Sequence, residues 1–205
     1  MQLKWLEWAK QIQAISQNGL AYSKDPYDIE RFHQLRSLSL EIMNEYTGVE
    51  TERIEGWFAN EIGYATPKVD VRAVVFQEDR ILLVKETIDG LWALPGGWAD
   101  IGLTPSQIAV KEVREESGYE VEPIRLLAVL DKMCHPHPPS PFHVYKIFIL
   151  CKLVGGEAKQ SIETSETGFF PLDALPPLST ERNTESQIQA MYKAAADPLS
   201  PVIYD

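Results

Sequence analysis

Apolar residues near the start of the chain recur at the spacing of amphipathic helices. From Leu3 to Ile15 they follow steps of about three and four residues, which predicts a helix that Gly19 ends. A second run of this kind extends from about Pro26 to Tyr46. Asp25 before this run is typical of an N-cap, and Gly48 after it is typical of a helix end. The pattern therefore predicts two long helices.

The character of the sequence changes near Pro67. A short third helix is predicted for about residues 51–60, and residues 63–67 have the glycine and proline that are typical of a linker. We therefore expect residues 1–62 to form a small all-α N-terminal domain and residues 67–205 to form a second domain.

The second domain combines β-rich runs with helical periodicity. Residues 69–76 and 80–85 are apolar runs separated by a polar turn, which predicts a hairpin. Further strands are predicted at residues 124–131, 144–153 and 168–171, and helices at 104–117 and 186–196. Strands interleaved with helices indicate a domain of mixed α and β structure.

The helix at 104–117 is specified by local signals at both of its ends. Thr104 is a good N-cap, Pro105 suits the first helical position, and Gln107 completes a capping box. Gly118 is a typical helix end about four turns later. This helix is therefore the element that the sequence predicts most directly.

Three carboxylates share one face of this helix. Glu112, Glu115 and Glu116 stand at positions i, i+3 and i+4. A solvated acidic face is the ordinary interpretation of such a pattern. However, the same stripe continues through the apolar Ile108, and the glycines of segment 95–97 let backbone approach a ligand or offer it a carbonyl. Clustered carboxylates that face packed structure instead favour a site for a hard divalent cation.

Composition and charge limit the classes of function. The chain has 205 residues, 44% hydrophobic and 24% charged, which is typical of a globular protein, and its net charge is −11. An acidic surface repels phosphate, so we expect no stable nucleic-acid partner and no membrane partner. The two cysteines are too few for a disulfide framework, and the N-terminus has no uninterrupted apolar run. A cytoplasmic protein is therefore expected.

The segment from Gly97 to Tyr119 resembles the Nudix box, Gly-x₅-Glu-x₇-Arg-Glu-hydrophobic-x-Glu-Glu-x-Gly-hydrophobic. The matching positions are Gly97, Glu112, Val113, Glu115, Glu116, Gly118 and Tyr119. Two positions depart from the pattern, because Leu103 replaces the first Glu and Lys111 replaces the Arg. In the family these two residues commonly form an ion pair that orients the helix, so that brace is in doubt here.

The resemblance implies an α+β fold, with a mixed sheet sandwiched between helices, and divalent-metal hydrolysis of a diphosphate bond. It implies that Glu112, Glu115 and Glu116 hold Mg²⁺ or Mn²⁺, together with the Gly97 carbonyl, and that Glu112 and Glu115 serve catalysis. The metal would activate a water for in-line attack on phosphorus. In related enzymes a glutamate from a loop outside the box often acts as the general base.

Candidates for the base and for substrate contacts lie outside the box. Glu163 and Glu166 are candidate bases, although isolated loop acids are more often plain surface charges. Arg72, Lys85 and Arg182 are candidates for contact with phosphate, with solvation the ordinary role of Lys85.

A proline-rich loop at 134–141 contains His135 and His137. A zinc site with Cys134 is conceivable, but the prolines make a compact tetrahedral site awkward, and a loop that shapes the substrate pocket is favoured. Trp98 is either a core residue or a platform for base stacking.

The helices that precede the box are similar to those of a bacterial Nudix subgroup of CDP-choline or ADP-ribose pyrophosphatases. This analogy places hydrolysis of CDP-choline to CMP and phosphocholine slightly ahead of ADP-ribose as the expected activity. A Nudix-like module that senses a nucleotide without cutting it is an alternative from another class. Trp5, Leu6 and Trp8 form an apolar stripe that favours burial at a subunit interface, so a homodimer is also expected.

Overall fold

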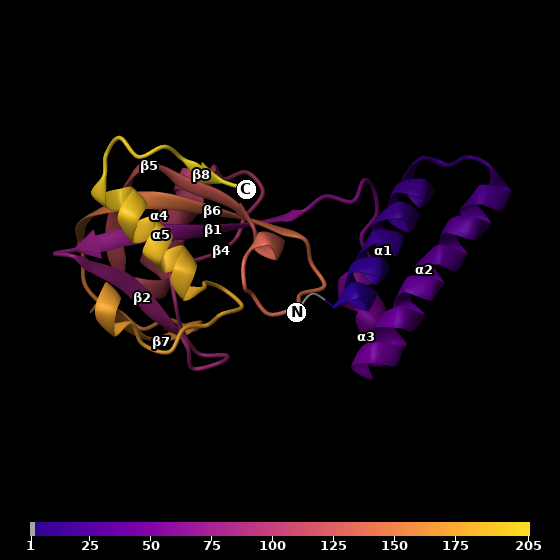
Figure 1. Ribbon diagram of the computed structural model, residues 1–205, viewed down its shortest axis with the longest axis horizontal. Helices are drawn as coiled ribbons and strands as arrows, with labels where there is room; N and C mark the ends of the chain where they lie inside the picture. Colours follow the sequence, from indigo (N-terminus) through magenta and orange to yellow (C-terminus); the bar gives the residue numbers. More distant parts are fainter. Residues whose placement is uncertain (1–2) are drawn as a thin grey trace. The chain divides into compact units, whose positions relative to one another are not determined.

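The first unit of the chain is helical. The computed structural model describes residues 3–205, and its first unit runs to Pro67 and includes the separate segment Pro139–His143 (Figure 1). Its elements are α1 (Lys4–Tyr22), α2 (Pro26–Thr47), α3 (Thr51–Ile54) and the π-helical turn Glu55–Ala59. Its core consists of Leu6, Ala9, Leu40, Met43, Ile54 and Ala59. The three helices predicted for this region are confirmed.

The ends of α2 form as its sequence predicts. The Asp25 side chain accepts hydrogen bonds from the N–H groups of Tyr27 and Asp28, and Gly48 ends the helix. An N-cap of this kind typically contributes about 1 kcal/mol to the stability of a helix.

The prediction that Gly19 ends the first helix is wrong, because α1 continues to Tyr22. A Cβ atom added to Gly19 would lie 2.3 Å from the ring of Phe32 on α2. The glycine therefore permits the close packing of two helices, and this contact outweighs its weak helix propensity.

The second unit is built on one eight-stranded sheet. It comprises Lys68–Pro138 and Val144–Asp205. The strands are β1 (Lys68–Gln77), β2 (Arg80–Glu86), β3 (Trp92–Ala93), β4 (Gly96–Trp98), β5 (Tyr119–Asp131), β6 (Val144–Gly156), β7 (Thr164–Pro171) and β8 (Ile203–Tyr204). Their order is β3-β2-β1-β6-β5-β8, with β4 paired to β1 and β7 paired to β2. The β1/β6 and β5/β8 pairs are parallel and the others antiparallel, so the sheet is mixed.

The predicted hairpin is confirmed. Strands β1 and β2 pair through Gln77 and Arg80, and the two turn residues Glu78 and Asp79 both have positive φ. Two positive values are what a tight two-residue turn between twisted strands requires. Three other predicted strands are longer than expected, because β5 begins at Tyr119, β6 ends at Gly156 and β7 begins at Thr164.

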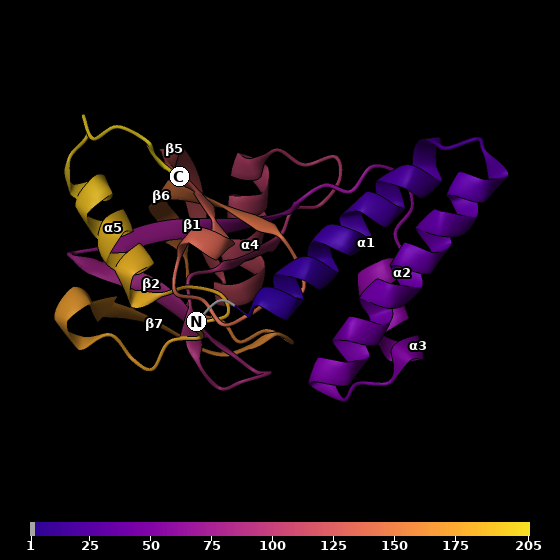
Figure 2. The ribbon, with the colours of Figure 1, turned by 45° about the vertical axis from the view of Figure 1, so that its right-hand side comes forward.

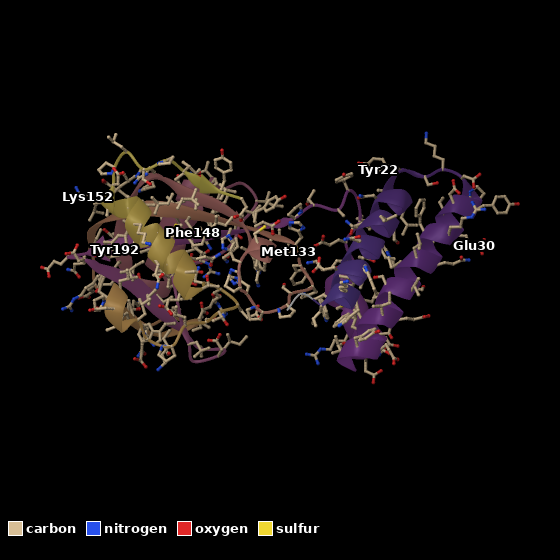
Figure 3. All side chains as sticks on the ribbon, in the orientation of Figure 1. Tyr22, Glu30, Met133, Phe148, Lys152 and Tyr192 are labelled. Atoms are coloured by element: carbon tan, nitrogen blue, oxygen red, sulfur yellow. The ribbon has the colours of Figure 1, made fainter. Side chains whose placement is uncertain are left out.

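Helices α4 (Pro105–Ser117) and α5 (Glu185–Ala196) lie on opposite faces of the sheet (Figure 2). On one face, Val71, Ala73 and Val75 of β1 pack in a core with Ile108, Ala109 and Val113 of α4. On the other face, Val74 of β1 and Phe148 of β6, which is labelled in Figure 3, pack in a core with Ile188, Met191 and Ala194 of α5. This confirms the α+β fold with a mixed sheet between helices. Short 3₁₀ turns at Lys132–Cys134 and Leu172–Ala174 complete the unit.

Both helices of this unit begin with a capping box. Thr104 and Gln107 exchange hydrogen bonds at the start of α4, and Thr184 and Gln187 do so at the start of α5. The box at α4 is the one that the sequence predicts, and Gly118 ends that helix as expected.

Strand β4 approaches β1 closely because it begins with glycine. Gly96 has φ 146°, and a Cβ atom there would lie 2.0 Å from the carbonyl oxygen of Val71. Any other residue would force the two strands apart. This approach brings the glycine backbone of β4 beside α4. Among residues 3–205, no helix is long and apolar enough to cross a membrane.

Candidate functional site

The row of glutamates on α4 lies against the glycines of β4. Glu116 is 4% exposed, and its Oε2 atom accepts a hydrogen bond from the Gly96 N–H at 2.9 Å. Glu112 is also buried, and a Cβ atom added to Gly97 would lie 3.4 Å from its Oε2 atom. The Glu115 side chain is 58% exposed. The glutamate row therefore extends from the buried Glu116 to the solvated Glu115, and the glycine backbone of β4 lies beside its buried end.

Burial makes two of these carboxyl groups weak acids. It raises the pKa of Glu116 to about 8, although the nearby Arg72 guanidinium opposes the shift. Burial also raises the pKa of Glu112, and the Lys111 ammonium opposes that shift. A carboxyl that is costly to ionise gains from a bound cation, which would lower the cost of its charge.

Lys111 lies among the carboxylates of the exposed end of the row. Its Nζ atom is 3.0 Å from Glu115 Oε2, 3.2 Å from Glu112 Oε1 and 3.2 Å from Asp100 Oδ2. The hydrogen bond to Glu115, followed by those to the other two carboxylates, raises the pKa of Lys111. Lys111 therefore has an acidic partner in Asp100, which lies three residues before Leu103.

A second ion cluster is buried beneath the site. Arg72 donates from Nε to Asp70 at 3.0 Å and from a terminal nitrogen to the Leu94 carbonyl at 3.0 Å. The Lys146 ammonium also bonds to Asp70. Asp70 and Lys146 are directly opposite in the parallel β1/β6 register, and both side chains are almost wholly buried.

The charges of this buried cluster perturb one another. Burial would raise the pKa of Asp70, but Arg72 and Lys146 outweigh it and lower that pKa. Burial lowers the pKa of Lys146 to about 8, although Asp70 opposes this shift. Arg72 also lies within the electrostatic field of Glu116, which connects the buried cluster to the glutamate row.

Glu86 is a further carboxylate near the site that the sequence analysis missed. It is buried at the end of β2 and pairs with Arg182, whose Nε atom is 2.8 Å from it. Burial raises the pKa of Glu86, and the fields of Arg182 and Arg72 oppose the shift. The available signal is its alternation with Leu82 and Val84, which places Glu86 on a buried face of β2.

The structure places the two candidate bases differently. Glu166 lies on β7 opposite Lys85, and their charged groups are 2.6 Å apart. Glu163 lies just before β7, where its carbonyl accepts hydrogen bonds from the N–H and hydroxyl of Thr87. The Glu163 side chain is exposed and contributes to the field that acts on Glu86. Lys85 therefore engages Glu166, whereas the charge of Glu163 acts on Glu86.

The remaining candidate residues lie at several places in the second unit. Arg182 is held by Glu86, by Asp89 at 3.1 Å and by the Ser179 hydroxyl at 2.9 Å. His135 pairs with Asp205 at 3.0 Å, and His137 Nδ1 lies 2.7 Å from the Thr180 carbonyl oxygen. Burial lowers the pKa of His137 to about 4, so its ring is neutral at pH 7. Trp98 on β4 is exposed, so it is not a core residue.

The residues of the glutamate row suit a divalent cation by their chemistry. Within residues 3–205, no set of three or more His, Cys, Asp or Glu side chains has the arrangement of a metal site. The reason lies in the contacts above, because Glu116 is turned to the Gly96 N–H while Lys111 holds Glu112 and Glu115. The donor set is nevertheless all oxygen, and an ammonium already occupies the point where two carboxylates converge. The residues present therefore fit a hard divalent cation.

Family models match two parts of the chain. Residues 3–58 match the UDP-X-like, N-terminal oligomerisation domain, and residues 66–191 match the NUDIX domain. The second match includes the whole glutamate row and the glycine strand.

Similar proteins extend over most or all of the chain. It is 52% identical over 205 residues to YjhB of Bacillus subtilis (strain 168), whose name gives ADP-ribose pyrophosphatase as a provisional activity, with 100% of this chain and 99% of YjhB covered. The crystal structure of an ADP-ribose pyrophosphatase from Streptococcus suis 89-1591 has a TM-score of 0.64 and 47% identity, over 68% of this chain and 100% of that chain. The crystal structure of a UDP-X diphosphatase has a TM-score of 0.65 and 32% identity, over 98% of both chains.

Proposed function

This chain belongs to the Nudix family of diphosphate hydrolases, and we propose that ADP-ribose is the substrate that it cleaves, to AMP and ribose 5-phosphate. The site supports hydrolysis because three carboxylates form a row beside the bare backbone of β4. The choice of substrate rests on the full-length similarity to YjhB and on the Streptococcus suis structure. These relatives favour ADP-ribose over CDP-choline, the first expectation from the sequence.

We assign the metal to the glutamate row. Glu112, Glu115 and Glu116, with the Gly97 carbonyl, would hold Mg²⁺ or Mn²⁺. When bound, such an ion offsets the charge of the diphosphate oxygens and acidifies the attacking water. The high pKa of Glu116 fits this assignment, because a buried carboxylate without a cation is costly to ionise.

The general base is assigned to Glu163 before Glu166. Glu166 is paired with Lys85 at 2.6 Å, whereas the exposed Glu163 side chain is close enough to Glu86 for its charge to act on that carboxylate. Replacing each by Gln separates them: we expect Glu163→Gln to lower kcat by about 10²-fold, the scale of general base catalysis, and Glu166→Gln to leave it within about threefold.

Arg182 is the best-placed cation for a phosphate contact. Its guanidinium is held in orientation by Glu86 and Asp89 while part of its side chain remains exposed, and a planar fork suits phosphate oxygens. Lys85 is a second phosphate candidate near the end of β2, where its ammonium is partly exposed and lies 2.6 Å from Glu166. Arg72 is buried and bonded on two sides, so we assign it to positioning Glu116 rather than to the substrate.

The nucleoside and its linked moiety are assigned to the exposed Trp98 and to the loop that carries the partly buried His135 and His137. Trp98 offers an indole for stacking at the end of β4. His135 and His137 are held by Asp205 and Thr180, so that loop can present a fixed wall to the moiety.

A UDP-linked compound is the second candidate substrate. The N-terminal match is to a UDP-X-like domain, and the UDP-X diphosphatase structure aligns over 98% of this chain. This alternative differs from ADP-ribose in the base and in the moiety, so a direct assay can separate the two.

The deciding experiment is a hydrolysis panel in Mg²⁺ or Mn²⁺, with ADP-ribose, UDP-glucose, CDP-choline and 8-oxo-dGTP as substrates and products identified by mass. We expect the highest kcat/KM for ADP-ribose and no turnover in EDTA. The highest value for UDP-glucose would move the assignment to the second candidate. Nucleotide binding without cleavage of any compound would instead identify a sensing module, the alternative from another class.

We also propose that the N-terminal unit forms a homodimer. Residues 3–58 match an oligomerisation domain. The stripe predicted from Trp5, Leu6 and Trp8 is wrong in part, because Leu6 is buried in the core of the unit and Trp5 stacks on Tyr46. Instead, Trp8, Ile15 and Tyr22 follow one another at seven-residue spacing along α1, all exposed (Figure 3 labels Tyr22). Seven residues are nearly two helical turns, so the three side chains share one apolar face. Light scattering should give a mass twice that of one chain. The double variant with Trp8→Glu and Ile15→Glu should give the mass of a single chain. A monomeric wild type would refute the dimer.

A further inference from the structure

The Lys111 ammonium occupies the place where a cation is expected. It lies 3.0 Å from Glu115 and 3.2 Å from Glu112, two of the residues to which we assign the metal. Its third partner, Asp100 at 3.2 Å, belongs to the loop between β4 and α4 and is not part of the glutamate row. One flexible cation is thus shared between two proposed metal ligands and one carboxylate outside the set.

Lys111 cannot keep all three of its carboxylate partners once a divalent cation is bound to Glu112 and Glu115. A carboxylate that ligates a divalent cation directs its lone pairs to that ion, and an ammonium beside the ion is repelled by it. Lys111 would therefore have to release Glu112 and Glu115. Asp100 remains available, because its side chain is 55% exposed and lies outside the row.

The two departures from the Nudix box favour this exchange. The residue at position 103 is leucine, which cannot pair with a cation, so the acidic partner comes from Asp100 instead. The residue at position 111 is lysine, whose ammonium is a point charge on a flexible stem, whereas an arginine fork would be held by one carboxylate in a fixed geometry. A lysine can therefore move between partners with little loss of bonding.

We propose that Lys111 is the counter-ion of the metal-free site and that Asp100 receives its ammonium when a divalent cation takes over Glu112 and Glu115. Lys111 thereby limits repulsion among the glutamates before the metal binds, and Asp100 sets how readily the lysine leaves. Lys111 and Asp100 are positioning residues in this scheme, which rests on the proposed metal assignment.

The test is the affinity for Mn²⁺, measured by electron paramagnetic resonance of the free ion, in the full-length protein without substrate. Lys111→Met removes the competitor, so we expect the Kd for Mn²⁺ to fall about five- to tenfold. Asp100→Asn removes the alternative partner, so the lysine holds Glu112 and Glu115 more firmly and the Kd should rise about threefold. The same two substitutions therefore shift the affinity in opposite directions.

Two controls separate exchange from a general effect of charge. Arg114→Met removes a positive charge from an exposed position on the same helix, and the Kd should change by less than about twofold. Asp100→Asn introduced into the Lys111→Met variant should have almost no effect, because there is no lysine left to hold. Thermal melting in EDTA adds a second readout, in which Lys111→Met should lower Tm and saturating Mn²⁺ should restore it.

Each result decides between distinct outcomes. Weaker Mn²⁺ binding by Lys111→Met would overturn the proposal, because the lysine would then support the metal-bound form. An equal effect of Asp100→Asn with and without Lys111 would also overturn it, because Asp100 would then act directly on the metal. Wild-type protein that binds no Mn²⁺ would overturn both this inference and the metal assignment. Wild-type binding that none of the variants alters would overturn this inference alone.

Discussion

Two ion clusters flank the glutamate row of α4, and they differ chiefly in their access to water. In the cluster of Asp70, Arg72 and Lys146, the side chains are 2–7% exposed, whereas Lys111 and Asp100 are 35% and 55% exposed. Buried charges must keep their partners, because an unpaired charge cannot be solvated there. Exposed pairs contribute at most about 1 kcal/mol each and can be exchanged for other partners.

This difference gives the two clusters different roles. The buried cluster fixes the base of the site and applies the field of Arg72 to Glu116. The exposed cluster holds Glu112 and Glu115 through Lys111, which is 35% exposed. In the scheme we propose, the buried cluster is a rigid support on one side of the carboxylates and Lys111 is a replaceable partner on the other.

The largest effect is expected at Glu116, where the row meets the buried cluster. Glu116→Gln preserves the shape of the side chain, and its amide oxygen can still accept the hydrogen bond from Gly96. The substitution removes the charge that would hold a metal. We expect kcat/KM to fall by at least about 10²- to 10³-fold, the scale of losing one electrostatic contact to the transition state. Steady-state kinetics in saturating Mg²⁺ measures this.

Glu120→Gln is the matched control for that substitution, because Glu120 is an exposed glutamate on β5. It should retain wild-type kinetics. Near-wild-type rates in Glu116→Gln would refute the assignment of Glu116 to the metal.

The second largest effect is expected in the stability of the buried cluster. Asp70→Asn leaves Arg72 and Lys146 as two buried cations without their shared anion, so the free energy of unfolding should fall by about 3–5 kcal/mol. Lys146→Met leaves the Asp70–Arg72 ion pair, whose charges cancel, and the methionine fills a similar volume. The free energy of unfolding should therefore fall much less than in Asp70→Asn. Urea unfolding of both variants measures this asymmetry, and equal losses would contradict the role of Asp70 as the shared anion.

The metal-free protein should become less stable as the pH rises from about 5 to 8. The pKa of Glu116 is about 8 in the folded chain, against an ordinary value of 4.5 for a glutamate in the unfolded chain, so the folded state binds one more proton in that window. Stability from this group is present below the lower pKa and is lost as the pH rises, at up to about 1.4 kcal/mol per pH unit. Thermal melting in EDTA should show a slope that Glu116→Gln reduces. An unchanged slope in Glu116→Gln would mean that titratable groups other than Glu116 cause the pH dependence of stability.

The sequence predicts elements that are specified by neighbours along the chain. The capping box, Pro105 and Gly118 determine α4 locally, and its 3.6-residue period places the glutamates on one face, so the row could be found without a structure. The turn of the β1/β2 hairpin is likewise a local signal.

The features that the sequence did not predict depend on distant contacts. Asp70 and Lys146 meet only because β1 and β6 pair in parallel, and the two residues are 76 positions apart in the sequence. A glycine is typical of a helix end, but Gly19 lies inside α1 because it packs closely against Phe32 of α2. Asp100 could not be identified as the partner of Lys111 because the motif places that acid at position 103.

The smallest effect is expected from the same chemical change in the exposed cluster. Asp100→Asn removes one carboxylate from Lys111, but Glu112, Glu115 and water remain to solvate the ammonium. The free energy of unfolding should therefore change by less than about 1 kcal/mol, against about 3–5 kcal/mol for Asp70→Asn. Urea unfolding of both variants in one buffer compares them directly. A loss at Asp100 as large as that at Asp70 would mean that Lys111 is fixed in place, since only a partner that cannot be replaced costs so much to remove.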